Sequence, residues 1–269
     1  MVVDLGHAGL PPYCLALLDE VRSLSGRPLR IIEEPGGLEF DSEIRMARRG
    51  ETEHVLSYRP EYRAYRAHFA VSSALKVLRQ YREPPELRLM PYVDPSARLP
   101  DDEERVLRQC PLLSGLPVAD VRAVSSFMHQ GLLRQLTSFP VDLRVEREIA
   151  PTLPEHAGRQ QAYFRRQVAD LVPHFAPELE RLAPPRTYRA ISAMNVVLGI
   201  VAAEIGGVPE HPVFRGSPHR TLGEALHDDL HAIRAPGRVG DYALTDRWAE
   251  QLGLWSAYHW AIADDRSRA

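Results

Sequence analysis

The stretch from residue 54 to residue 81, HVLSYRPEYRAYRAHFAVSSALKVLRQY, decides the fold of this chain. Its first five residues, His54–Tyr58, read as a short strand that ends before Pro60. Residues 61–81 contain neither glycine nor proline, which predicts one long helix. The apolar side chains of this helix point in several directions, so we expect it to be buried on more than one side. They are Tyr62, Tyr65, Phe69, Val71, Leu75 and Leu78.

Upstream of this stretch the pattern predicts one helix and two further strands. Leucine and valine recur at helical spacing over residues 13–24, and the sequence Ser25-Gly26-Arg27-Pro28 stops that helix. Residues 29–33 form a short apolar strand, and residues 43–47 alternate apolar and polar side chains as a half-buried strand does. The expected order is therefore helix, three short strands and the long helix.

Downstream of residue 81 the chain reads as helical. Residues 87–100 are a proline-punctuated connection, and Ser138-Phe139-Pro140 is expected to break the helical pattern. The expected helices cover residues 101–109, 121–137, 141–149, 160–172, 176–182, 189–205, 222–233 and 245–263. The last of these helices carries an aromatic cluster that we interpret as packing, formed by Trp248, Trp255, Tyr258 and Trp260.

These elements predict an α+β, mainly helical fold. A small N-terminal sheet packs on the long helix, and an all-helical C-terminal half follows. We expect an α+β region over residues 1–150 and a helical region over residues 151–269, with one continuous domain as the alternative.

The composition excludes several classes of protein. Hydrophobic residues make up 44% and charged residues 26% of the 269 positions, which excludes wholesale disorder. Cys14 and Cys110 form no CxxC pair, so neither a disulfide scaffold nor a zinc ribbon is expected. The net charge of −3 gives no signal for nucleic-acid binding.

Targeting and membrane signals are also missing from the pattern. The most apolar stretch, residues 191–205, is shorter than the roughly 20 residues that a spanning helix needs and contains Asn195 and Glu204. The N-terminal residues have no basic region ahead of an apolar core, so no signal peptide is expected. We therefore expect a cytoplasmic protein without a membrane partner. Arginine accounts for all but one of the Lys+Arg positions, Lys76 being the exception, which is typical of a GC-rich bacterial genome.

The order of elements in residues 13–150 resembles that of the ImmA/IrrE-type zincin metallopeptidases. In that family a first helix and a small sheet precede a helix bearing His-Glu-x-x-His, whose histidines bind zinc and whose glutamate is the general base. The matching segment here is AHFAVS, residues 67–72. His68 stands at the first histidine position, Phe69 at the glutamate and Ser72 at the second histidine. The resemblance implies a zincin fold whose hydrolytic machinery is lost.

The resemblance also implies a third metal ligand on a later helix. Asp142 and Glu146 are the candidates, because they lie four residues apart on one helix face. We expect His68 to face the helix that carries them. The alternative is a purely structural role, in which His68 is a buried hydrogen-bonded histidine, Asp142 caps its helix, and Glu146 pairs with a neighbouring arginine.

Two other patterns suggest different chemistry. Arg63 and His68 have the Arg-x-x-x-x-His spacing of HEPN-type ribonucleases, in which both residues contact the scissile phosphate, although the strands do not suit that all-helical fold. His227 and His231 lie one helical turn apart, with Glu224 three residues before His227, so all three side chains share a face that suits zinc. The alternative for these histidines is a solvated polar face.

We therefore expect a catalytically inactive metallopeptidase-like protein that binds a peptide or protein partner in the former substrate cleft, without a cofactor. Whether the protein is an enzyme stays open, and Phe69 and Ser72 at the glutamate and second histidine positions argue against it. One alternative is a zinc-dependent hydrolase built from His68 with Asp142 or Glu146, or from His227 and His231. The other is a HEPN-like ribonuclease that uses Arg63 and His68.

Overall fold

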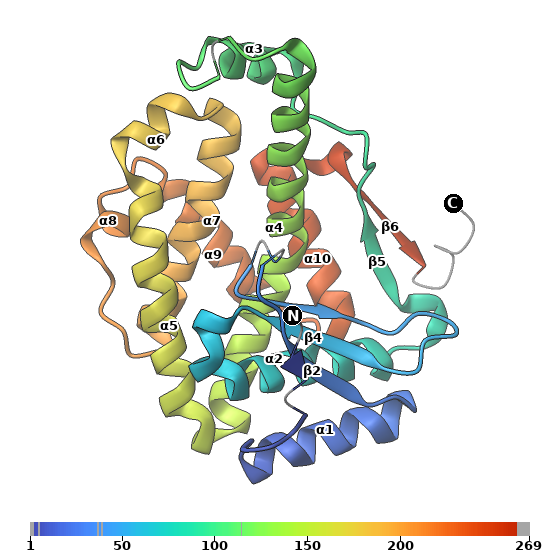
Figure 1. Ribbon diagram of the computed structural model, residues 1–269. Helices are drawn as coiled ribbons and strands as arrows, with labels where there is room; N and C mark the ends of the chain where they lie inside the picture. The colour runs from blue at the N-terminus through green and yellow to red at the C-terminus, as the bar shows by residue number, and fades with distance from the viewer. Residues whose placement is uncertain (1–2, 5, 37, 39, 114, 263–269) are drawn as a thin grey trace.

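The computed structural model describes residues 3–262 apart from 5, 37, 39 and 114, and shows an α+β, mainly helical fold (Figure 1). Its first half contains helix α1 (Pro12–Ser25), four short strands and helix α2 (Arg66–Arg82). Helix α1 ends where the sequence predicts, because Gly26 takes a left-handed conformation with φ of 73° and its N–H bonds to the carbonyl of Arg22.

The four strands form one sheet in the order β1-β2-β4-β3. Strands β2 (Leu29–Glu33) and β4 (His54–Tyr58) are parallel at the centre, with Leu29 opposite His54. Strands β1 (Val3–Asp4) and β3 (Ser42–Arg45) are antiparallel to their neighbours at the two edges. The predictions for β2 and β4 are confirmed residue for residue, and β3 begins and ends earlier than the expected 43–47.

Helix α2 packs between this sheet, helix α1 and helix α4. Residues 60–65, which the sequence assigned mostly to the helix, form a 3₁₀ turn instead, and the α-helix begins at Arg66. Most of α2 is buried, as its apolar side chains on several faces predicted. The apolar cluster around it includes Cys14, Leu18, Val21, Ile31, Leu56, Phe69 and Val77.

Helix α4 (Val118–Thr152) runs through the length of the molecule as one element (Figure 1), so the predicted break at residues 138–140 is wrong. Pro140 costs the helix about 3 kcal/mol because it removes a backbone hydrogen bond. Packing on both sides offsets that cost: Leu133 and Leu136 lie in the C-terminal apolar cluster, whereas Val145 and Ile149 lie in the cluster around α2.

Further helices, one before α4 in the chain and the others after it, lie around α4. The elements are α3 (Asp101–Gln109), α5 (Ala157–Leu171), α6 (Pro177–Leu182), α7 (Pro185–Glu204), α8 (Pro212–Arg215), α9 (Arg220–Ala232) and α10 (Gly237–Leu252). Helices α7 and α9 approach closely at Gly223, where an added Cβ would lie 2.5 Å from Val196 Cγ1. This close approach fixes which face of α9 points away from the core.

The C-terminal half is not all-helical, contrary to the prediction. Helix α10 ends at Leu252, since Gly253 adopts a left-handed φ of 71°. Strand β6 (His259–Ile262) then pairs antiparallel with β5 (Leu89–Tyr92), which lies in the connection predicted to be irregular. The expected helix end, Ala263, lies outside the described residues.

The aromatic residues assigned to that last helix have separate environments. Trp248 is fully buried in the core, whereas Trp255 is exposed. Tyr258 and Trp260 both donate hydrogen bonds to Asp246 Oδ1, at 2.6 and 2.8 Å. The indole and phenol groups therefore anchor the chain that leads into β6 to helix α10.

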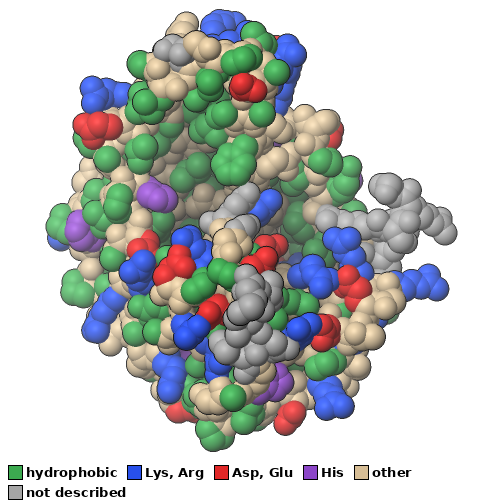
Figure 2. All heavy atoms as spheres, in the orientation of Figure 1, with side chains coloured by type: hydrophobic (Ala, Val, Ile, Leu, Met, Phe, Trp, Pro, Cys, Tyr) green, Lys and Arg blue, Asp and Glu red, His purple; other side chains and the backbone are tan. Residues whose placement is uncertain are grey.

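On the face shown in Figure 2, acidic and basic side chains are interspersed around the sheet, and hydrophobic side chains gather at the end formed by α3 and the start of α4. The exposed apolar residues there include Leu112, Leu116, Val118 and Phe127. Within the described residues, no helix combines the length and the hydropathy that a membrane crossing requires.

Candidate functional site

His68 lies at the centre of a buried polar cluster, hereafter the His68 centre, formed by His68, Glu146 and His156. The Nε2 atom of His68 lies 3.1 Å from Glu146 Oε1 on α4, as expected from the sequence. Its other ring nitrogen, Nδ1, lies 3.1 Å from His156 Nε2. His156 was not predicted, because it lies in the short turn after α4, where no spacing pattern points to His68.

Hydrogen bonds connect this centre to two further helices. The Tyr13 hydroxyl of α1 lies 3.0 Å from His156 Nδ1 and accepts a hydrogen bond from Arg159 at 3.2 Å. On the other side, Gln160 Nε2 of α5 donates to Glu146 Oε2 at 2.8 Å. The His68 centre therefore connects α1, α2, α4 and α5.

Aromatic side chains cover the centre. The ring centroid of Tyr163 lies 4.3 Å from that of His68, and Phe69 packs against Tyr58, Tyr62 and Tyr163. His68 is 1% exposed and Glu146 is 6% exposed, so protein atoms cover both partners. Phe69, which the sequence resemblance aligned with the glutamate of a zincin, is a buried core side chain.

Burial changes the pKa values of the groups in this centre. Desolvation raises the pKa of Glu146. The charge of His68 and the hydrogen bonds from His68 and Gln160 lower it by more, so the pKa of Glu146 lies below its ordinary value. For His156, desolvation together with the neighbouring His68 lowers the pKa to about 4. The His156 imidazole is therefore neutral at neutral pH.

The residues of the His68 centre do not fit the zinc ion that the zincin resemblance implies. The two ring nitrogens of His68 contact Glu146 and His156 separately, and these nitrogens diverge from the ring, so one metal ion cannot take all three residues. Phe69 offers no ligand atom. Asp142, the other candidate, pairs with Lys76 Nζ at 2.5 Å.

Comparison with known proteins found no matching family model, no matching curated protein and no matching solved structure.

The structure does not bring Arg63 and His68 to a common site. The Arg63 guanidinium is exposed and donates to both carboxylate oxygens of Glu33, through Nε at 2.6 Å and Nη2 at 2.5 Å. The His68 ring is buried on α2, away from solvent. Arg63 thus has an ion-pairing role at the edge of the sheet.

His227 and His231 do lie together, on α9, but their carboxylate neighbour differs from the expected one. Glu224 pairs with Arg220 at 2.7 Å. Glu204, the last residue of α7, lies 3.0 Å from His227 Nε2 and 3.5 Å from His231 Nε2 instead. The contact between α7 and α9 brings this carboxylate to the histidines, and periodicity within α9 gives no sign of it.

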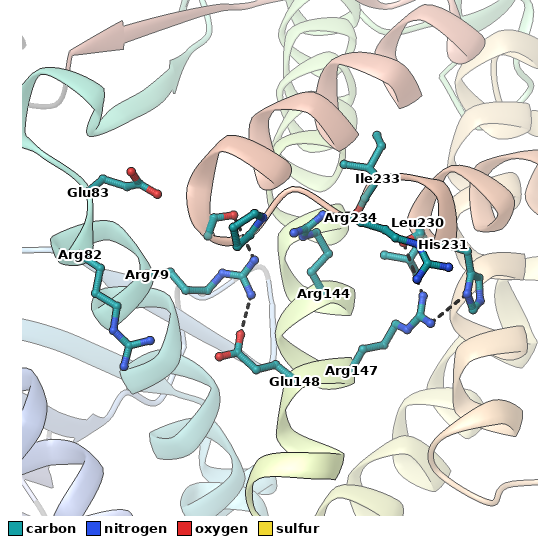
Figure 3. A pocket seen from close by; sticks show the side chains of 12 residues that line it. Arg79, Arg82, Glu83, Arg144, Arg147, Glu148, Leu230, His231, Ile233 and Arg234 are labelled. Atoms are coloured by element: carbon teal, nitrogen blue, oxygen red, sulfur yellow. Dashed lines mark hydrogen bonds and ion pairs between the residues drawn. The ribbon is translucent and has the colours of Figure 1, made fainter.

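A second feature that sequence reasoning missed is a pocket of about 740 Å³ between α2, α4 and the segment joining α9 to α10, hereafter the arginine pocket (Figure 3). Glu83 and Glu148 are its acidic lining residues, and His231 lies at its edge. Its arginines are Arg79, Arg82, Arg144, Arg147 and Arg234. They come from three separate segments of an arginine-rich chain, so no local pattern marks them.

The base of the pocket is a buried ionic network. Asp241 is fully buried and contacts Arg79 at 2.6 Å, Arg144 at 3.0 Å and Arg238 at 3.4 Å. Glu148 pairs with Arg79 at 2.7 Å, as the dashed line in Figure 3 marks. These contacts hold Arg79 and Arg144 in fixed positions below the opening.

Other arginines of the pocket keep their charge available. Arg147 donates to His231 Nδ1 at 2.9 Å and weakly to the Leu230 carbonyl at 3.5 Å, and neither acceptor is a carboxylate. Arg234 is exposed, and within the described residues it has no ion pair. The pocket thus presents unneutralised guanidinium groups beside a rigid base, an arrangement suited to carboxylates.

Proposed function

We propose that this protein is a catalytically inactive, metallopeptidase-like binding protein that acts in the cytoplasm and recognises an acidic peptide or protein segment in the arginine pocket. The observation that carries the proposal is the pairing of a large pocket with Arg147 and Arg234, two guanidinium groups that lack carboxylate partners among the described residues.

The arrangement of the His68 centre supports the proposal that the protein has no peptidase activity. Phe69 cannot take a proton from a metal-bound water, and the partners of His68 do not converge on one metal position. The sequence predicted that a partner binds in a cleft beside His68. Because His68 and Glu146 are buried and a partner cannot reach them, we place the binding site in the arginine pocket instead.

An acidic peptide suits the pocket better than a phosphorylated compound. Arginine binds carboxylates through two parallel hydrogen bonds, and the volume falls in the range of about 300–1,000 Å³ typical of ligand pockets. Glu83 and Glu148 also line the pocket, and their carboxylates can accept hydrogen bonds from the N–H groups of a peptide, which a polyphosphate does not offer. The buried free thiols of Cys14 and Cys110 fit a reducing compartment.

The test is fluorescence anisotropy with a labelled glutamate-rich peptide, with lysine-rich peptide and tripolyphosphate as competitors. The double variant Arg147→Met/Arg234→Gln should bind the peptide at least about tenfold more weakly, because two charge-assisted hydrogen bonds are lost. Arg181→Gln, at an exposed ion pair on α6, is the matched control and should leave affinity unchanged.

Equal affinity of the double variant and the wild type would contradict the proposed site. Tighter binding of tripolyphosphate than of the peptide would contradict the proposed ligand. Mass spectrometry of the incubated peptide tests the absence of hydrolysis: cleavage that a chelator abolishes would overturn the inactive assignment.

A further inference from the structure

Glu204, His227 and His231 form a cluster in which each residue offers a ligand atom, and these atoms lie within 4.8 Å of one another. The distances are 3.0 Å from Glu204 Oε1 to His227 Nε2, 3.5 Å from Glu204 Oε2 to His231 Nε2, and 3.2 Å between the two Nε2 atoms. All three residues are thus within reach of a single point between α7 and α9.

The two distances that share His227 Nε2, 3.0 Å to Glu204 Oε1 and 3.2 Å to His231 Nε2, are close to the edges of a zinc coordination tetrahedron. Histidine nitrogen and carboxylate oxygen bind zinc at about 2.1 Å, and a tetrahedron with bonds of that length has edges of about 3.4 Å. The two imidazoles and one carboxylate are also the ligand types of open zinc sites, which keep a fourth position for water or a ligand. We infer that Glu204, His227 and His231 bind a zinc ion with one open coordination position.

The fold holds these side chains in place without the metal. On α9, Leu226 and Leu230 are buried in the core, so His227 and His231 are turned toward the C-terminal end of α7. The side chains of Glu204, His227 and His231 are 36%, 12% and 44% exposed, so an ion can enter from solvent. A site preorganised on two packed helices loses little entropy when the metal binds.

Arg147 opposes the binding of a zinc ion to His231. Its Nη2 donates to His231 Nδ1 at 2.9 Å. When Nε2 holds a metal, Nδ1 carries the ring proton and cannot accept that hydrogen bond, and the guanidinium charge repels the cation. Zinc binding therefore displaces Arg147 toward the arginine pocket, which His231 also lines. Replacement of Arg147 by an uncharged side chain should strengthen zinc binding.

The experiment is isothermal titration of the full chain with zinc chloride, repeated with cobalt(II), whose visible absorption reports tetrahedral coordination. The wild type should bind one equivalent, and Glu204→Gln and His231→Ala should each weaken binding by at least about tenfold, since even the loss of an outer partner costs about 10- to 100-fold. Arg147→Met should bind more tightly than the wild type.

Two control variants separate this site from other ligands. Glu224→Gln lies on the same helix but pairs with Arg220, and His174→Ala removes an exposed histidine elsewhere, so neither should change the affinity. Circular dichroism verifies that each variant is folded, which is expected for positions near the surface. An absence of stoichiometric zinc binding by the folded wild type, or an unchanged cobalt spectrum in Glu204→Gln, would overturn the inference.

Discussion

Acidification should destabilise this protein through His156, the fully buried histidine that contacts His68 and Tyr13. Its pKa is lowered from 6.5 to about 4 in the folded state, chiefly by desolvation. Between these two values the unfolded chain binds a proton that the folded protein does not, so stability is complete above about pH 6.5 and falls as the pH drops. The loss ends near pH 4, below which both states are protonated.

The size of the effect follows from the two pKa values. Between about pH 7 and about pH 4.5, the linkage through His156 alone removes about 2 kcal/mol of unfolding free energy. Buried His54, whose pKa is also lowered to about 4 by desolvation, adds a loss of similar size. A variant that lacks only the His156 imidazole should therefore keep the loss of stability that His54 causes on acidification. It should no longer show the loss that His156 causes.

Urea unfolding followed by circular dichroism at the two pH values measures the difference. The stability of His156→Gln should fall by about 2 kcal/mol less than that of the wild type over this interval, even if the variant is less stable at neutral pH. His174→Gln, at an exposed position, should follow the wild type. An equal loss in His156→Gln and the wild type would refute the assignment of a neutral buried imidazole.

Three further substitutions test the packing and the ionic network. Asp241→Asn should cost about 3–5 kcal/mol in urea unfolding, because it leaves arginine charges without their buried carboxylate; a cost below about 1 kcal/mol would show that the network is not required. Phe69→Ala should cost about 3–5 kcal/mol, since Phe69 is a core side chain, whereas a neutral effect would mean that the position is not packed. In thermal melts, Gly223→Ala should destabilise the protein by about 1–3 kcal/mol, because the added methyl group collides with Val196. Gly131→Ala, where the methyl group enters open space on α4, should stabilise the protein by about 0.5–1 kcal/mol. A more stable Gly223→Ala than Gly131→Ala variant would contradict the close contact of α7 and α9.

The elements of the first half of the chain were predictable because their signals are local. The absence of glycine and proline after Glu61 indicated helix α2, and the turn at Gly26 marked the end of α1. The expectation that His68 faces the helix of Glu146 came from the resemblance to zincins and not from a local pattern. The predictions for α1 and α2 use information that neighbouring residues carry.

The errors concern contacts between distant segments. Strand β6 needs its partner β5, which lies far back along the chain, so the residues after Gly253 read as a continued helix. Helix α4 continues through Pro140 because two apolar clusters hold it. The position of Glu204 beside His227 likewise depends on how two helices pack. Tertiary packing decides each of these features, and periodicity does not report it.

Hydrogen–deuterium exchange with and without the glutamate-rich peptide tests the central claim most directly, because it locates the bound ligand on the chain. The account predicts slower exchange in residues 144–148 and 230–237, which line the arginine pocket, and no change around β3 and α5. Slower exchange confined to residues 42–45 and 157–171, on the side of the His68 centre, would contradict recognition in the arginine pocket.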